Sequence, residues 1–471
     1  NLLFSSLRGW GYDPVAMKLS NDTAGHLLTD EAVQQFIEDG YVLVQSGVPD
    51  LVHRAIFDRL EEALTDGGNP GNNLLPRIPE IQQVLEDPVL QGALTSLLGP
   101  DYILNPHRYP HVTPPGGGGG GWHKDCYVWD NNMRHPRFHW VLALYYPQDT
   151  TEEMGATGVQ PGRHVYEEIS SENPDECTEL GVPLCGSAGT VALVHFDAWH
   201  RARTNTSSRK RYMLKFQFAR LREPAEPMWN HATVNWNPEG ADRDVARDVW
   251  NWLCGRSNGG RNGDGGLKGD DAPRLLKRLR EGTEAERLRS AFRLGAGGSA
   301  IVPDLLEALR DEASRVVDRI EDKTPDNYFG TNPTALRAAQ ALVSMGAEAV
   351  PGIIPALKDE EWVVRASLAD ALGLIGSSAV AAVDALVECV GDEHWWVRRN
   401  ATEALGRIGT RSSTVSSLLV AALQDEDWRV RQAAALAMAR LRVRADGDVE
   451  ALEVMLRDES RYNRFYAALA L

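Results

Sequence analysis

Two histidines, an aspartate and an arginine are spaced so that they could build a ferrous oxygenase site. His123 and Asp125 stand two positions apart, His200 follows 77 positions after His123 (200 − 123), and Arg211 follows 11 positions later (211 − 200). In an extended strand, side chains two positions apart point the same way, so His123 and Asp125 can hold one ion. With a third ligand from a distant strand, two histidines and one carboxylate leave metal positions open for a cosubstrate and dioxygen, as in non-haem Fe(II) oxygenases.

The segments around these residues have the pattern of strands. An apolar run over 190–196 leads toward His200, and residues 211–218 alternate with a period of two. This alternation predicts two faces. One face carries Tyr212, Leu214, Phe216 and Phe218, and the other carries Arg211, Met213, Lys215 and Gln217. An arginine borne by a strand near a metal can bind a carboxylate, because its guanidinium offers a fork of donors that lysine does not reproduce.

Several motifs in this part of the chain resemble those of the phytanoyl-CoA dioxygenase-like group of Fe(II)/2-oxoglutarate oxygenases. The motifs lie at 36–44, 122–125, 146–155, 160–164 and 199–211, and their order and spacing match over roughly 29–222. The resemblance implies that Fe(II), 2-oxoglutarate and O2 are used and that succinate and CO2 are coproducts. The metal ligands that it implies are His123, Asp125 and His200.

The resemblance also implies how the cosubstrate is held. Arg211 would bind the distal carboxylate of 2-oxoglutarate, and Lys124 and Thr204 are further candidate contacts. An alternative for Lys124 is a solvated or supporting role, because it points away from the metal in an ideal strand. Some relatives have a hydroxyl residue two positions after the second histidine, whereas this chain has Ala202.

The identity of one ligand bears on the type of reaction. Halogenating relatives replace the carboxylate with a small residue, so the intact Asp125 predicts hydroxylation or another oxidation rather than halogenation.

An alternative ligand and an alternative metal are also possible from the sequence. His195 is a rival ligand, but its alternation with Val191 and Leu193 favours a packed core position. Zinc also accepts histidine and aspartate. Arg211 at the family spacing favours iron.

The substrate is weakly specified by the sequence. Aromatic residues around the metal motif could line a pocket, although aromatic residues in sheets are more often core. Arg203 could attract an anionic substrate or be a charge at the rim. The candidate pocket residues are Trp122, Tyr127, Trp140 and Arg203. The expected substrate is a small or lipid-like molecule with an unactivated C–H bond.

Composition limits the possible classes of protein. The 471 residues carry a formal net charge of −17, which argues against a protein built mainly to bind nucleic acid. No run approaches the roughly 18 apolar residues of a membrane helix. The five cysteines are odd in number and lack metal-ligand spacing, which favours a reducing, cytoplasmic location.

The domain organisation changes at a glycine-rich stretch. Seven of the fifteen residues over 255–269 are glycine, which is typical of a linker. Short strands before it predict a multidomain chain that begins with a double-stranded β-helix, a cupin-like jelly roll with flanking helices. Strands are expected at 102–106, 122–128, 139–146, 156–160, 190–196 and 211–219. The predicted domains are an oxygenase domain at 1–254, a linker at 255–272 and a helical repeat domain at 273–471.

The last part of the chain is repetitive. Asp359–Arg365, Asp392–Arg398 and Asp425–Arg431 share a pattern with a spacing of 33 residues (392 − 359 and 425 − 392), and a degenerate copy starts at Asp458. Each copy leads into an alanine- and leucine-rich helix, which predicts an α-solenoid. The repeats resemble HEAT-like repeats of the phycobilisome-lyase type. The repeated aspartate and arginine are expected to cap helices and to bridge neighbouring repeats.

These features leave more than one function open. The leading interpretation is an active dioxygenase whose repeats recruit a protein partner, stabilise the enzyme or mediate self-association. The alternatives are a HEAT-repeat scaffold with an idle oxygenase fold, and a protein hydroxylase whose repeats recruit the substrate. The intact His123, Asp125, His200 and Arg211 favour an enzyme.

Overall fold

The computed structural model describes residues 23–125, 135–167, 181–233, 235–256, 267, 271–321, 336–442 and 446–471. The chain divides into two compact units. One unit comprises 1–125, 136–221 and 227–235, and the other comprises 126–135, 222–226 and 236–471. Predicted features within 126–134 and 168–180, and most of the glycine-rich stretch, lie outside the described residues.

The first unit is built around two antiparallel sheets. The larger sheet has the order β1-β7-β4-β9-β2, with β3 also paired to β9. Its strands are β1 (Tyr41–Gln45), β2 (Tyr102–Leu104), β3 (Tyr109–Thr113), β4 (Trp140–Tyr145), β7 (Thr190–His195) and β9 (Arg211–Arg220). The smaller sheet has the order β6-β5-β8 and consists of β5 (Gly158–Val159), β6 (Val182–Pro183) and β8 (His200–Arg201). This is the predicted cupin-like arrangement of antiparallel sheets.

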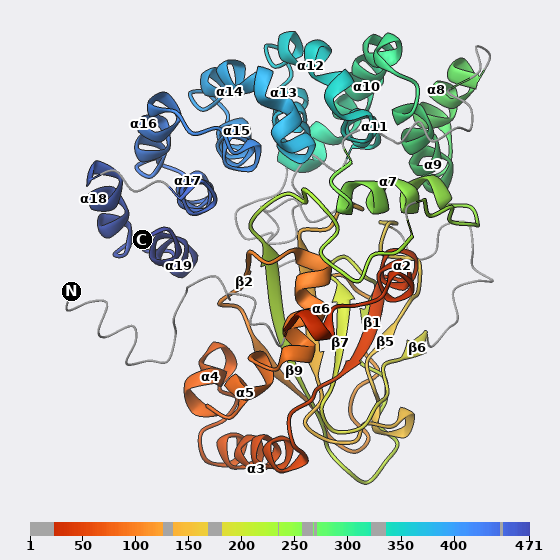
Figure 1. Ribbon diagram of the computed structural model, residues 1–471, viewed down its shortest axis with the longest axis vertical. Helices are drawn as coiled ribbons and strands as arrows, with labels where there is room; N and C mark the ends of the chain where they lie inside the picture. Colours follow the sequence, from red (N-terminus) through yellow and green to blue (C-terminus); the bar gives the residue numbers. More distant parts are fainter. Residues whose placement is uncertain are drawn as a thin grey trace. The chain divides into compact units, whose positions relative to one another are not determined.

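The first unit also contains helices. They are α2 (Asp30–Asp39), α3 (Asp50–Asp66), α4 (Leu74–Arg77), α5 (Ile81–Leu85) and α6 (Pro88–Leu98). Helices α2 and α6 both contact β1, and Figure 1 shows α6 beside the strands. The Phe57 ring of α3 meets Tyr212 of β9 edge-on at 5.3 Å between centroids. Tyr212, on the even-numbered apolar face of β9, therefore contacts a helix, whereas Arg211 and Lys215 lie on the other face of the strand.

The structure lacks most of one predicted strand and contains a strand that the sequence did not predict. The sequence predicts a strand over 122–128, but in its described part only His123 forms a bridge, to His200. Strand β3 was not predicted. It contains Pro110, and proline within a run lowers the expectation of a strand because it cannot donate to the ladder.

Asp30 ties a C-terminal segment of the first unit to the start of α2. Its carboxylate accepts hydrogen bonds from Trp229 Nε1 at 2.6 Å and from the backbone N–H groups of Ala232 and Thr233 at 2.9 and 2.7 Å, and it lies 3.0 Å from His231 Nδ1. Burial alone would raise the pKa of Asp30, but these hydrogen bonds outweigh it and hold the pKa well below its usual value.

Loss of the Asp30 charge is expected to destabilise the first unit. The lowered pKa means that the contribution of Asp30 is fully present above its unfolded value of about 3.9 and is lost as the pH falls below it. Asp30→Ala should lower the free energy of unfolding by about 2–4 kcal/mol at pH 7. It should also flatten the decline of stability below about pH 4. Thermal unfolding as a function of pH measures both effects, and an unchanged acid profile would contradict this account.

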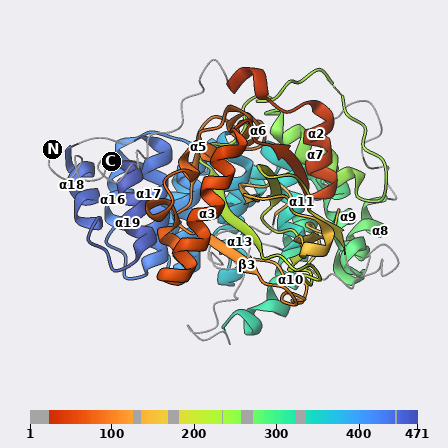
Figure 2. The same ribbon diagram turned by 90° about the horizontal axis from the view of Figure 1, so that it is seen from below.

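The second unit consists of helices. They are α7 (Arg243–Leu253), α8 (Asp271–Glu281), α9 (Glu284–Gly295), α10 (Val302–Glu321), α11 (Arg337–Met345), α12 (Val350–Ala356), α13 (Trp362–Ile375), α14 (Val383–Cys389), α15 (Trp395–Ile408), α16 (Ser413–Ala422), α17 (Trp428–Leu441), α18 (Asp446–Met455) and α19 (Arg461–Ala470). Helices α13, α15, α17 and α19 contact one another in succession, as Figure 1 shows, and Figure 2 shows α17 beside α19. This is the predicted solenoid.

The division between the units differs from the predicted domain boundary at 254. Helix α7 contacts α9, and Arg289 Nε donates to Asp242 Oδ1 at 2.8 Å just before α7 begins. Residues 236–254 therefore group with the repeats, although the sequence prediction placed them in the oxygenase domain. The predicted linker at 255–272 stays a prediction.

One apolar stretch satisfies the length and composition of a membrane span. It covers Trp362–Cys389. The stretch comprises α13, a 3₁₀ segment with a kink at Ala379, and α14. Every residue of α13 after Trp362 is buried, as expected for a core helix of a solenoid.

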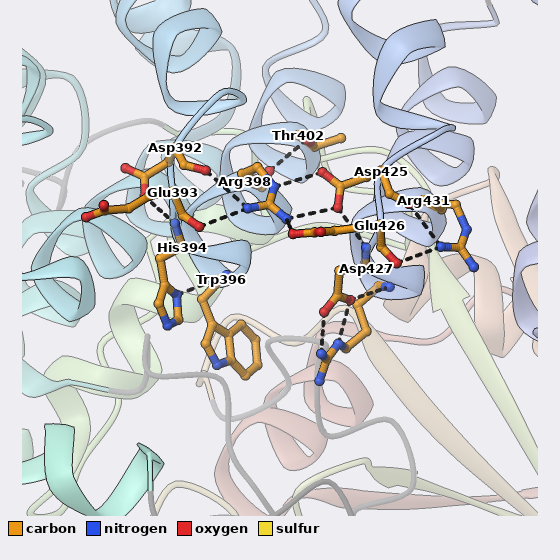
Figure 3. A network of polar contacts seen from close by, with 11 residues as sticks. Asp392, Glu393, His394, Trp396, Arg398, Thr402, Asp425, Glu426, Asp427 and Arg431 are labelled. Atoms are coloured by element: carbon orange, nitrogen blue, oxygen red, sulfur yellow. Dashed lines mark hydrogen bonds and ion pairs between the residues drawn. The ribbon is translucent and has the colours of Figure 1, made fainter.

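Arginine and aspartate side chains link successive repeats (Figure 3). Arg365 Nε donates to Asp392 Oδ2 at 2.7 Å, and Arg398 Nε donates to Asp425 Oδ2 at 2.8 Å. Arg431 makes the same contact with Asp458 at 2.7 Å. Each arginine also donates from Nη1 to two carbonyl oxygens just before its own helix. The predicted bridging role is therefore present in three consecutive repeats.

Removal of one arginine from this row of arginine–aspartate links is expected to destabilise the solenoid. Both Arg398 and Asp425 are largely buried, with side-chain exposures of 11% and 13%. Arg398→Ala removes a donor from two carbonyl groups and from the Asp425 carboxylate, which keeps only its hydrogen bond from the Asp427 N–H, so we expect a loss of about 2–4 kcal/mol in the free energy of unfolding. Denaturant unfolding measures it, with the exposed Arg411→Ala as the control, which should change stability by no more than about 0.5 kcal/mol. Equal effects of the two substitutions would contradict a contribution of the arginine–aspartate links to stability.

Candidate metal centre

His123, Asp125 and His200 come together in the first unit. One potential ligand atom from each lies within 4.8 Å of the others. The two histidines are paired through the main chain, because each backbone N–H donates to the other's carbonyl oxygen at 3.0 Å. Strand β8, which begins at His200, is held in turn by β5. The spacing of the two imidazoles is therefore set by the backbone.

Hydrogen bonds orient both imidazoles. The Nδ1 atom of His123 lies 3.1 Å from the carbonyl oxygen of Gly121, and that of His200 lies 3.0 Å from the carbonyl oxygen of Ala198. A carbonyl accepts only, so Nδ1 carries the proton and Nε2 keeps its lone pair for a metal. Burial lowers the pKa of His200, although Asp125 opposes this shift. The neutral form that binds metals is thus favoured.

The donor set fits a divalent transition metal. Asp125 Oδ1 lies 3.7 Å from His200 Nε2, a separation that two ligands of one ion can have and a hydrogen bond cannot. Two imidazoles and one carboxylate on one side are the ligands of ferrous oxygenases. His123 is exposed, whereas Asp125 and His200 are buried, so the set is reached from the side of His123.

Arg211 carries donors that a carboxylate would satisfy. It is the first residue of β9 and is 1% exposed. Its Nη2 donates to the carbonyl oxygen of Gly155 at 3.0 Å, while Nε and Nη1 are buried and have no partner among the described residues. Burial lowers the pKa of Arg211. Buried donors without partners are costly, so this guanidinium fits the distal carboxylate of 2-oxoglutarate.

Gly155 makes the position of its carbonyl group possible. Its φ is +72°, and a Cβ atom there would lie 2.5 Å from the carbonyl oxygen of Arg203. Only glycine fits such a close approach with positive φ. The turn that ends at Gly155 also contains Glu152, which pairs with Arg203 at 2.6 Å.

Three residues predicted to contact cosubstrate or substrate have other surroundings. The Nζ of Lys124 lies 2.8 Å from Asp197 Oδ2 and donates to the carbonyl oxygen of His164 at 3.2 Å, so Lys124 supports the fold beside the site. Thr204 is exposed, and Arg203 is paired with Glu152. Contacts of Lys124, Thr204 and Arg203 with cosubstrate or substrate stay predictions.

The aromatic pocket candidates are dispersed. Trp122 is partly exposed and lies under the Arg201 guanidinium, 4.8 Å from its ring centroid. Trp140 is buried against Phe196 at 5.9 Å. Tyr127 lies outside the described residues. A substrate role for these residues stays a prediction.

His195 is packed in the core. Its ring lies 5.7 Å from that of Phe138 and 4.7 Å from that of His164. Burial lowers the pKa of His195 to about 3, with a further contribution from the positive charge of Lys124. A neutral histidine between rings is a core residue rather than a ligand.

Sequence reasoning missed two polar residues beside the ligands. Lys215 of β9 lies 2.9 Å from Asp125 Oδ2. His111 of β3 lies opposite Met213, and its buried Nε2 has no partner among the described residues. Burial lowers the pKa of His111 to about 3, assisted by the positive charges of Lys215 and Arg211. The period-two pattern places Lys215 on the face of Arg211, but no sequence signal indicated β3.

Comparison with known proteins agrees with this arrangement. The family model for phytanoyl-CoA dioxygenase matches residues 24–213, and the model for HEAT repeats matches 332–406 and 383–471. The chain therefore carries a phytanoyl-CoA dioxygenase domain of the Fe(II)/2-oxoglutarate oxygenase class, followed by HEAT repeats. No curated protein matches the chain.

Solved structures of non-haem oxygenases are similar to part of the chain. The non-heme monooxygenase ThoJ is 19% identical, with 43% of this chain and 84% of that chain covered and a TM-score of 0.34. The α-ketoglutarate-dependent carbocyclase SnoK from nogalamycin biosynthesis is 20% identical, with 41% and 85% covered and a TM-score of 0.34. EctD from S. alaskensis, solved with 2-oxoglutarate and 5-hydroxyectoine, is 17% identical, with 51% and 88% covered and a TM-score of 0.36.

Proposed function

We propose that the chain is an Fe(II)- and 2-oxoglutarate-dependent dioxygenase that hydroxylates, or otherwise oxidises, an unactivated C–H bond of a small or lipid-like molecule. The observation that carries the proposal is the convergence of His123, Asp125 and His200 within 4.8 Å. The two buried, unpartnered donors of Arg211 support it, because they match a carboxylate. Bound iron and 2-oxoglutarate would supply the oxidative chemistry, with succinate and CO2 as coproducts.

The chain's own residues have separable tasks in this proposal. The imidazole Nε2 atoms and one oxygen of Asp125 hold the metal, and the Gly121 and Ala198 carbonyl groups keep the Nδ1 protons away from it. Arg211 orients the cosubstrate through its distal carboxylate. The intact Asp125 supports oxidation without halide, since a halide ligand needs the position that this carboxylate takes.

The test is turnover by the full chain. The protein is first loaded with Fe(II) in the absence of oxygen. It is then mixed with 2-oxoglutarate, O2 and a metabolite extract, and succinate is measured together with untargeted metabolite profiles of the extract. We expect succinate formation that requires both iron and 2-oxoglutarate and the appearance of a product heavier by one oxygen. Failure of the protein to bind a divalent metal, or a chlorinated product, would contradict the proposal.

We also propose that the repeats bind a protein partner or a second copy of the chain, because solenoids present long surfaces with few internal constraints. Turnover by the chain ending at residue 235 discriminates between the enzyme classes. A small-molecule oxygenase should retain turnover, whereas a hydroxylase that recruits a protein through the repeats should lose it. We further propose a reducing, cytoplasmic location, because the five cysteines are odd in number and lack metal-ligand spacing.

A further inference from the structure

Lys215 forms a buried ion pair with one of the metal ligands. Its Nζ lies 2.9 Å from Asp125 Oδ2 and 3.2 Å from Oδ1. The two side chains are only 6% and 3% exposed. Lys215 stands on the same face of β9 as Arg211, four positions along the strand. An ammonium group therefore lies directly beside the carboxylate of the candidate metal ligands.

The two oxygens of Asp125 have different neighbours. Oδ1 lies 3.7 Å from His200 Nε2, a distance compatible with two atoms that each bind a shared ion at about 2.1 Å. Oδ2 is the oxygen closer to Lys215. Lys215 contacts both oxygens but lies nearer to Oδ2, whereas Oδ1 is the oxygen near His200 Nε2, so we assign Oδ1 to the metal.

We propose that Lys215 is a fixed counter-ion of Asp125 that positions this carboxylate as a one-oxygen ligand and weakens the binding of the metal. The inference rests on the proposed function. A cation held a few ångströms from a divalent ion opposes its binding, since like charges repel strongly in a buried site. The same cation satisfies the carboxylate when the metal leaves, so the ligands keep their places. Lys215 thus provides a preformed site that exchanges its metal.

The decisive comparison is between the full-length chain and its Lys215→Met variant, both freed of metal with a chelator and titrated with Mn(II) alone. The EPR signal of free Mn(II) measures the dissociation constant. We expect Lys215→Met to bind Mn(II) at least about tenfold more tightly, because the opposing charge is gone. Its melting temperature without metal should fall, because the buried Asp125 loses its ion pair with Lys215, and Mn(II) should raise it more than in the parent chain. Lys215→Arg keeps the charge and should bind Mn(II) like the parent.

A matched control removes an equally buried lysine. Lys124 pairs with Asp197 at 2.8 Å, with exposures of 5% and 7%, but Asp197 is not a ligand. Lys124→Met should lower the melting temperature without tightening Mn(II) binding. Should Lys215→Met not fold, Lys215→Gln removes the same charge and carries the same expectation.

The outcomes separate this inference from the proposed function. Equal or weaker binding of Mn(II) by a folded Lys215 variant without the charge overturns the role of Lys215 alone. An unmodified chain that does not bind Mn(II) overturns the proposed function together with this inference. Tighter binding with a larger thermal shift supports both.

Discussion

The His200→Ala variant is expected to lose iron- and 2-oxoglutarate-dependent succinate formation almost completely. His200 supplies a buried Nε2 within 3.7 Å of Asp125 Oδ1, so its removal leaves two ligands. Loss of groups that merely support a ligand typically reduces metal affinity or activity about 10–100-fold, so loss of a ligand should cost at least about 100-fold. Succinate formation and Mn(II) binding measure the effect.

The control for this prediction is a buried histidine that is not a ligand. His195→Gln alters a core side chain between Phe138 and His164. It should lower the melting temperature and leave the dissociation constant for Mn(II) within about twofold of the parent, a change well below the 1.4 kcal/mol of a tenfold difference. Normal turnover by His200→Ala, or loss of metal by His195→Gln alone, would reverse the assignment of the ligand.

The second large effect is expected from Arg211→Lys. This change keeps the charge but removes the planar fork, whose Nε and Nη1 have no partner among the described residues. Truncating one partner of a buried charge pair costs about 2–5 kcal/mol, so the KM for 2-oxoglutarate should rise on the order of 100-fold. Mn(II) affinity should change little, since Arg211 does not bind the metal. Steady-state kinetics with varied 2-oxoglutarate measure the shift.

Arg220→Lys is the matched control for Arg211→Lys. Arg220 is also buried on β9, at its other end, and its Nη2 donates to the carbonyl oxygen of Leu97 at 2.6 Å. This variant should be less stable but should have an unchanged KM for 2-oxoglutarate. An equal rise in KM for both variants would assign the effect to the strand rather than to the cosubstrate contact.

Periodic features of this chain could be predicted because they depend on local rules. The alternation over 211–218 assigns Arg211 and Lys215 to one face of β9, and the structure agrees. The repeat spacing of 33 residues, starting at Asp359, predicts the row of helices that includes α13, α15 and α17. In each case the pattern reflects burial of one face, which the sequence records directly.

Features that depend on contacts between distant segments could not be predicted in the same way. The approach of Lys215 to Asp125 requires β9 and the segment around His123 to pack together. No local pattern in either segment predicts this contact. For Lys124, by contrast, a local pattern did predict the direction of the side chain. Strand alternation already indicated that Lys124 points away from the metal, and the structure pairs it with Asp197.

The reciprocal main-chain hydrogen bonds between His123 and His200 have a consequence for how this enzyme could diversify. Because peptide groups rather than side chains hold the two imidazoles in register, their separation does not depend on the identity or length of the intervening surface segments. Substitutions in those segments could therefore change substrate selectivity without changing the geometry of the metal ligands.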